Sequence, residues 1–229
     1  MRPVSVGDVI GQAWAGYQRW WRYLVPLALV AYVSLGLFAL LVILLMGPIG
    51  LICAALMFTV GYAWIEGVLI RAIDDIQNGD DELWIGTRLA RLRPRMNALS
   101  VGTLLSIAVV VVGFMFFFVP GILLLVWWAL LVPIVVLEGE GAVGALKRSR
   151  SLVRGHWWTV FFTLLVTGLL TGLAAAIVGA LGGILSAPSL LTHVIGTGLV
   201  APFAALTTAV LYYELRGPRG SSIPERFSL

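Results

Sequence analysis

The sequence predicts an all-α fold in which several transmembrane helices form one polytopic membrane domain, and three observations support this prediction. First, 60% of the 229 residues are hydrophobic and 11% are charged, whereas a soluble domain carries about 25% charged residues. Second, the apolar residues form long continuous runs instead of the alternating pattern of a β-barrel. Third, the 15 Lys and Arg residues cluster in segments that separate pairs of apolar runs. This composition excludes a soluble globular domain and a disordered chain.

The apolar runs predict six transmembrane helices, and the short turns between them arrange these helices as three hairpins. A helix needs about 20 mainly apolar residues to cross a bilayer. The outer turns are expected at Gly47-Pro48, at Pro120-Gly121 and near Ser186. We expect a single domain over residues 1–216 and a flexible cytoplasmic tail over residues 217–229. The predicted spans are residues 24–46, 49–70, 98–119, 122–137, 157–185 and 190–213.

The distribution of charge predicts the orientation of this domain. All 15 basic residues precede the first hairpin, lie between hairpins or follow the last one, so they occupy one side of the membrane. Lys and Arg are enriched on the cytoplasmic side of membrane proteins. We therefore expect both termini in the cytoplasm and an outer face with almost no polar surface.

Each hairpin is preceded by a segment in which apolar residues recur with helical periodicity. This pattern predicts cytoplasmic amphipathic helices over residues 5–22, 80–96 and 141–154, and the triple occurrence of one such helix plus two spans suggests a threefold internal repeat. The expected apolar face of the first helix comprises Val6, Ile10, Ala13, Trp14, Tyr17 and Trp21. That of the third comprises Ala142, Ala145, Leu146, Ser149 and Val153.

Two of these amphipathic helices also carry a stripe of basic residues. Such a helix can lie in the headgroup plane, where each Lys or Arg near anionic lipid contributes about 1 kcal/mol. It can also dock a cytoplasmic partner or form a pocket for a lipid headgroup, and both interpretations stay open. The candidate contact residues are Arg88, Arg91 and Arg95 in the second helix and Lys147, Arg150 and Arg154 in the third.

Small residues recur along the fifth predicted span at the spacing that lets two helix backbones approach closely. The residues singled out for helix packing are Gly168, Gly172, Ala176 and Gly179. Two interpretations of the helix that packs against this stripe stay open. One is the sister helix of the same hairpin, and the other is a second copy of the chain in a homo-oligomer.

Glu66 is the one Asp, Glu, Lys or Arg residue inside a predicted span. Intramembrane carboxylates are candidates for a functional role, because burying a charge in a bilayer is costly. Glu66 lies five residues before Arg71, so it can also extend toward water or pair with an inner arginine. A structural role and a role in coupling to protons or cations therefore both stay open.

The sequence contains no motif that predicts catalysis. There is no His-Glu-x-x-His zinc motif, no Gly-x-Ser-x-Gly elbow and no phosphate-binding P-loop. With one cysteine and two histidines, a site for a metal or another cofactor is not expected. We therefore expect a protein that is not an enzyme, that has no cofactor and that does not bind nucleic acid.

The segment 119–158 contains a succession of short motifs that resembles the bacterial and archaeal glycerophosphoryl diester phosphodiesterase membrane domain family. The start of the chain, Gly7-Asp8-Val9-Ile10, and its ending from Tyr212 to Arg216 also fit that family. The resemblance implies a protein of the prokaryotic inner membrane, of unassigned function. The chain lacks the His and acidic motif residues of the phosphodiesterase barrel, so no activity is implied. The motifs are Pro120-Gly121-Ile122, Trp127, Pro133 to Gly139, Ala145 to Ser149, Leu152 to Gly155 and Trp157-Trp158.

Two functions follow as hypotheses. In the first, the chain is a non-enzymatic membrane module whose cytoplasmic helices bind anionic phospholipid, dock a partner protein of lipid or envelope metabolism, or do both. In the second, it is a transporter or flippase for a lipid-like or small amphiphilic substrate. The second hypothesis predicts an internal cavity lined by Glu66, Thr59 and the region of Pro133.

Overall fold

The computed structural model describes residues 5–78, 92–186 and 189–217, and all regular secondary structure in these ranges is helical. The predicted all-α fold is therefore confirmed. The elements are α1 (Val6–Asn78), the 3-10 helix η1 (Arg93–Arg95), α3 (Met96–Phe116), α4 (Phe118–Trp127), α5 (Leu131–Pro133), the π-helix η2 (Ile134–Glu138), α6 (Ala142–Val153), α7 (Trp157–Ile184) and α8 (Ser189–Arg216).

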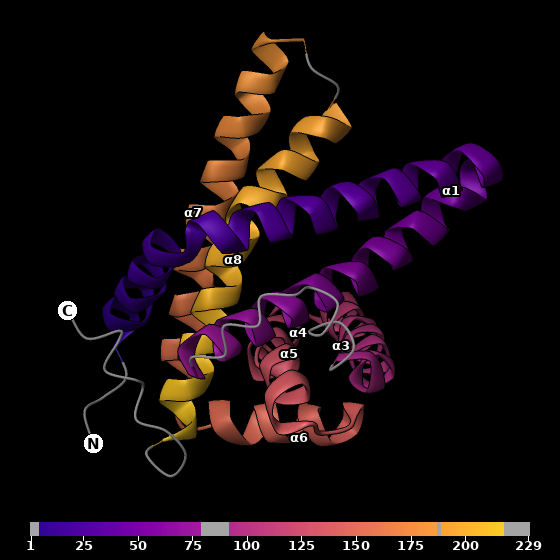
Figure 1. Cartoon of the computed structure of the whole chain (residues 1–229). Coiled ribbons are helices and arrows are strands. Elements are labelled where there is room, and N and C mark those ends of the chain that lie inside the picture. Colours follow the sequence, from indigo (N-terminus) through magenta and orange to yellow (C-terminus); the bar gives the residue numbers. More distant parts are fainter. Residues whose placement is uncertain (1–4, 79–91, 187–188, 218–229) are drawn as a thin grey trace.

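Within these ranges, five helical segments are long and apolar enough to cross a membrane. Their length and composition indicate a membrane protein, in agreement with the sequence analysis. The first segment is α1, which contains both spans that the sequence predicts for the first hairpin. Its backbone leaves the helical conformation at Gly47, where φ is 59° and ψ is −134°. Glycine adopts positive φ without steric cost, so the ribbon reverses direction at this residue (Figure 1).

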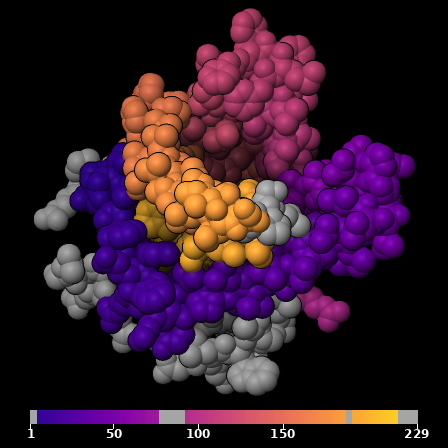
Figure 2. All heavy atoms as spheres, turned by 90° about the horizontal axis from the view of Figure 1, so that it is seen from above, coloured from indigo at the N-terminus to yellow at the C-terminus, as the bar shows by residue number. Residues whose placement is uncertain are grey.

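The helices form three pairs that meet at one end and diverge at the other. The pairs are the two halves of α1, α3 with α4, and α7 with α8. In Figure 1 the far end of α1 points away from the far ends of α7 and α8. Figure 2, seen from above, shows the α3–α4 pair leaving in a third direction. The shared end holds the most deeply buried large side chains, among them Tyr32, Tyr212, Leu69 and Ile134.

The first half of α1 packs along α8. A Cβ atom on Gly198 would lie 3.2 Å from the Cα of Leu29, and one on Gly36 would lie 3.0 Å from a methyl group of Val194. The first turns of α1 continue this contact: the Gln12 side-chain amide donates to Glu214 Oε1 (3.2 Å), and the Tyr17 hydroxyl donates to the Leu199 carbonyl (3.0 Å). The first amphipathic segment is therefore the beginning of α1 and lies against the bundle.

This packing corrects the apolar face predicted for residues 5–22. The buried side chains are Val9, Ala13 and Trp20, whereas Trp14 and Trp21 of the predicted face are about half exposed. Ala13 is shared by both faces. The prediction is confirmed for Ala13, which is buried, and for Ile10 and Tyr17, which are partly buried against the core. The rings of Trp14 and Tyr17 also contact Phe203 of α8, so the covered side of this segment extends from the predicted face to Val9 and Trp20.

The small-residue stripe of α7 also differs from its expected role. Gly168, Gly172, Ala176 and Gly179 are exposed, and a Cβ atom on any of the three glycines would meet nothing within 4 Å. The expected contact with the sister helix is therefore not made at these positions. The α7–α8 contact runs instead along another side of α7, where Gly182 lies against Thr192.

The third amphipathic helix matches its prediction. Ala145, Leu146, Ser149 and Val153 of α6 are buried, and Lys147 and Arg150 are exposed. The predicted span 122–137 is not one regular helix, because α4, a turn, α5 and η2 divide it. Of the predicted helix 80–96, residues 80–91 lie outside the described residues, as does most of the predicted tail.

We predict that Gly198→Ala destabilises the protein. The added Cβ atom would lie 2.6 Å from a methyl group of Leu29 and close to its Cα, so α1 and α8 would have to separate. Overpacking of this kind costs about 1–3 kcal/mol, which lowers the free energy of unfolding measured in detergent micelles. Gly172→Ala is the control, because its Cβ atom meets no neighbour. Equal stability of the two variants would contradict this account of the α1–α8 contact.

Candidate functional site

The principal candidate site is a cavity of about 470 Å³ between the second half of α1, α3 and the interrupted helix of α4 and α5. Its wall includes Thr59, Glu66 and Val132, the last of which directly precedes Pro133. The cavity therefore lies where the transport hypothesis placed one. The remaining lining residues are Phe58, Tyr62, Ala63, Thr103, Ser106, Ile107, Trp128, Ala129 and Leu131.

The interruption of the helix is built from a turn at residues 128–130 between α4 and α5. Pro133 has no backbone N–H, so the Ala129 carbonyl four residues earlier lacks its helical donor. Ser149 of α6 joins the two sides of the turn: its hydroxyl donates to the Trp127 carbonyl (2.7 Å) and accepts from the Leu130 N–H (3.2 Å). This residue is fully buried. The turn therefore depends on α6 beneath it.

Glu66 lies in the wall of this cavity and is held by α8. Its Oε1 atom accepts a hydrogen bond from the Thr208 hydroxyl at 3.2 Å. The expected alternative, pairing with Arg71, is not formed, because Arg71 contacts Asp74 (3.4 Å) and Asp75 (3.2 Å) instead. Within the described part of the chain, no Lys or Arg forms an ion pair with Glu66. Its carboxylate therefore faces the cavity without a counter-charge.

Two further polar side chains face the same space from α3. The Ser106 hydroxyl donates to the Thr103 carbonyl at 2.8 Å, which satisfies its proton. The Thr103 hydroxyl is buried and has no hydrogen-bond partner among the described residues. An unsatisfied buried hydroxyl costs about 1–3 kcal/mol, so this atom is available to a ligand.

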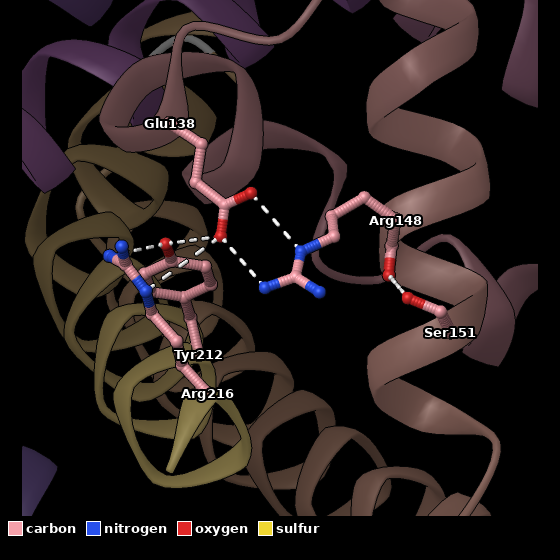
Figure 3. A network of polar contacts seen from close by, with 5 residues as sticks. All are labelled: Glu138, Arg148, Ser151, Tyr212 and Arg216. Carbon is pink, nitrogen blue, oxygen red and sulfur yellow. Dashed lines mark hydrogen bonds and ion pairs between the residues drawn. The ribbon is translucent and has the colours of Figure 1, made fainter. Parts of the chain in front are cut away.

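A second polar group joins the end of η2, α6 and the last turns of α8 (Figure 3). The Glu138 carboxylate, at the end of η2, accepts hydrogen bonds from Arg148 Nε (3.2 Å) and from the Tyr212 hydroxyl (2.8 Å). Arg216 Nη1 donates to the same tyrosine oxygen at 3.0 Å, and its Nε lies 3.9 Å from Glu138. This carboxylate thus connects η2, α6 and α8, and its charge is balanced. It has the character of a structural clamp.

The basic candidates on α6 have a different environment from Arg148. Lys147, Arg150 and Arg154 are exposed, and none of them forms an ion pair within the residues that the structure describes. The Arg150 guanidinium lies over the Trp127 ring, 4.3 Å from its centroid. This contact holds the arginine extended along the surface while its N–H groups stay accessible.

The predicted basic residues are only partly brought together. Arg95 belongs to η1 and approaches the residue after Glu138: a Cβ atom on Gly139 would lie 3.2 Å from Arg95 Nη2. It is thus close to the beginning of α6. Arg88 and Arg91 lie outside the described residues. Glu66 belongs to the separate cavity, and the small-residue stripe of α7 takes part in neither site.

Comparison with known protein families, with curated proteins and with solved structures finds no match to this chain. The chemistry of its sites must therefore be argued from its own residues.

Sequence reasoning did not assign roles to Ser149, Thr208 and Glu138. Ser149 was placed correctly on the apolar face of α6, and Pro133 signalled that the helix before it would lose a hydrogen bond. No sequence feature near Ser149 or Pro133 indicates that the two residues act on the same turn. The link between Thr208 and Glu66 joins residues 142 positions apart, and no sequence pattern indicates it.

We predict that Ser149→Ala destabilises the protein, because it leaves the Trp127 carbonyl and the Leu130 N–H without a partner in the interior. Such a loss costs about 1–3 kcal/mol of unfolding free energy. Ser151→Ala is the matched control, since the Ser151 hydroxyl is exposed and bonds to the Arg148 carbonyl of its own helix. Thermal unfolding in maltoside micelles measures both. A control as unstable as Ser149→Ala would show that the helix interruption does not depend on this hydroxyl.

Proposed function

We propose that this chain is a non-enzymatic integral membrane protein that binds anionic phospholipid headgroups at the cytoplasmic face of α6. The observation that carries the proposal is the set of three exposed basic side chains on α6, namely Lys147, Arg150 and Arg154. Each has no acidic partner among the described residues. The neighbouring Arg148 differs, because Glu138 neutralises it. The apolar face of α6 holds the helix against the bundle, and its basic side chains can therefore contact lipid phosphate groups.

The proposed placement in the bilayer has six spans, with both termini in the cytoplasm. The reversal of α1 at Gly47 supports two spans within that element. The last turns of α8 and the whole of α6 share one end of the molecule, because Glu138 contacts both, and this end carries the charged residues. The three diverging helix pairs of Figure 2 are compatible with the suggested threefold repeat. The inner membrane of a prokaryote is the proposed location.

The proposed family assignment is the glycerophosphoryl diester phosphodiesterase membrane domain family. Its support is that the motif-bearing residues 120–158 build connected structure: the interrupted helix, the Glu138 clamp and α6. A partner protein of lipid or envelope metabolism would dock on the same α6 surface. A homo-oligomer would use the exposed small-residue stripe of α7.

The cavity favours a second candidate function, which is transport or flipping of a lipid-like or small amphiphilic substrate. A tightly packed interior would have argued against transport, whereas the structure holds a cavity of about 470 Å³ that contains Glu66. Discontinuous helices commonly line the substrate sites of transporters, and α4, α5 and η2 form such a helix here.

We predict that Lys147→Gln combined with Arg154→Gln weakens binding of phosphatidylglycerol. Two basic residues near anionic lipid contribute about 2 kcal/mol, which corresponds to a loss of roughly 30-fold in affinity at low salt. Native mass spectrometry of the full chain, titrated with phosphatidylglycerol in micelles, measures the dissociation constant.

The matched control combines Arg19→Gln with Arg22→Gln. It removes the same charge from two exposed positions of α1. Retention of affinity in this control, together with loss in the α6 variant and weaker binding at high salt, is the expected result. Equal affinities for both variants and the unchanged protein would reject α6 as the headgroup site.

A further inference from the structure

We propose that the cavity between α1, α3 and the interrupted helix binds an organic cation, with Glu66 as its counter-charge. The ligand is an ammonium or phosphonium group attached to an apolar body. This site is separate from the α6 surface. It rests on the second candidate function, because it names the class of substrate that the cavity would take.

The electrostatics of Glu66 argue for a positively charged occupant. A carboxyl group in apolar surroundings either takes up a proton or pairs with a cation, because the cost of burying an unpaired charge is large. Among the described residues its hydrogen-bond donor is Thr208, whose single proton also lies within reach of the carbonyls of Ala204 (3.2 Å) and Ala205 (3.1 Å). One shared hydroxyl proton leaves most of the acceptor capacity of the carboxylate unused. A cation in the cavity would meet this need.

The aromatic residues in the wall argue that this cation is organic. Phe58, Tyr62 and Trp128 line the cavity together with Glu66. The face of an aromatic ring attracts a cation, and this attraction is strongest where water is excluded, so aromatic walls are typical of sites for quaternary ammonium groups. A carboxylate beside aromatic rings therefore provides both charge and a suitable surface for alkylated ammonium.

The size of the cavity and its oxygen content disfavour a bare metal ion. Ca²⁺ and Mg²⁺ are held by about six or more oxygen atoms at short distances. The described residues contain no group of three or more His, Cys, Asp or Glu that could hold a metal ion. A volume of about 470 Å³ also exceeds what one ion occupies, and Ile107 and Leu131 add apolar wall. The buried Thr103 hydroxyl, which has no partner among the described residues, remains as an acceptor for an ammonium N–H.

The cavity is accessible from the surface of the molecule. Tyr62 and Ile107 belong to its wall and are 39% and 42% exposed, so they form a rim. Figure 2 shows the surface hollowed between the α3–α4 pair and the other helices. An amphiphile could therefore enter with its apolar part among the diverging helices and its charged group toward Glu66. The same chemistry is found in free organic cations and in the ammonium headgroup of phosphatidylethanolamine.

The test uses the full chain in maltoside micelles, which carry no cation, and radiolabelled tetraphenylphosphonium as the probe in equilibrium dialysis. We expect saturable binding of the probe, and we expect Glu66→Gln to weaken it roughly tenfold or more, because it removes the counter-charge. Glu140→Gln is the control, since it removes an equal charge from an exposed position outside the cavity. Its affinity should equal that of the unchanged protein.

A second variant tests the proposal even where Glu66→Gln fails to fold. Ser106→Leu fills part of the cavity and leaves Glu66 in place, and we expect it to weaken binding by a comparable factor. Unchanged affinity in Glu66→Gln or in Ser106→Leu, or no saturable binding to the unchanged protein, would overturn the proposal. The assay measures neither transport nor the binding of anionic lipid to α6. Its outcome is therefore distinguishable from failure of either proposed function.

Competition with lipid then identifies the source of the cation. Displacement of the probe by phosphatidylethanolamine, but not by phosphatidylglycerol, supports a lipid headgroup as the occupant. Displacement by neither lipid supports a free organic cation. Displacement by phosphatidylglycerol as readily as by phosphatidylethanolamine would contradict a cation-selective cavity.

Discussion

The hydroxyl group of Ser149 satisfies two backbone groups inside an apolar interior, and much of the molecule depends on it. A membrane offers no water to a carbonyl or an N–H at an interrupted helix, so the protein itself must supply the partner. Ser149 does so for Trp127 and Leu130. The interruption, in turn, brings Trp128 and Ala129 into the wall of the cavity. The same contact fixes α6 beneath the bundle, so that its opposite side faces outward.

Charge is arranged around this centre in two distinct ways. Near the last turns of α8, acidic groups are matched by basic ones: Glu138 contacts Arg148, and Asp74 contacts Arg71. In the cavity, the hydrogen bond that Glu66 receives from the described part of the chain comes from the hydroxyl of Thr208. Carboxylates that are paired with arginine join helices to one another. A carboxylate without such a pair in an apolar wall can instead form an ion pair with a ligand. The contrast separates the structural carboxylates from the functional candidate.

Sequence reasoning succeeded where one property of a segment decides its structure. Length and apolarity identified the membrane helices, and periodicity identified the buried face of α6, because an amphipathic helix with one strongly basic side has a single way to pack. It failed where two segments compete. At the start of α1, Trp14 and Trp21 are about half exposed, whereas Val9 and Trp20 are buried, because the position of α8 decides which side of α1 is covered. In the apolar run over residues 122–137, Pro133 indicates that a helical hydrogen bond is lost, but no residue of the run indicates which group replaces it. The link of Ser149 to that run exists only in the folded chain.

The divergence of the three helix pairs has a mechanical consequence for the surrounding bilayer. Because the pairs meet at the charged end and separate toward the turn at Gly47, the molecule widens from one end to the other (Figures 1 and 2). In the proposed placement, such a wedge would occupy unequal areas in the two leaflets. Acyl chains would then fill the spaces between the helix pairs and border the cavity between α1 and α3.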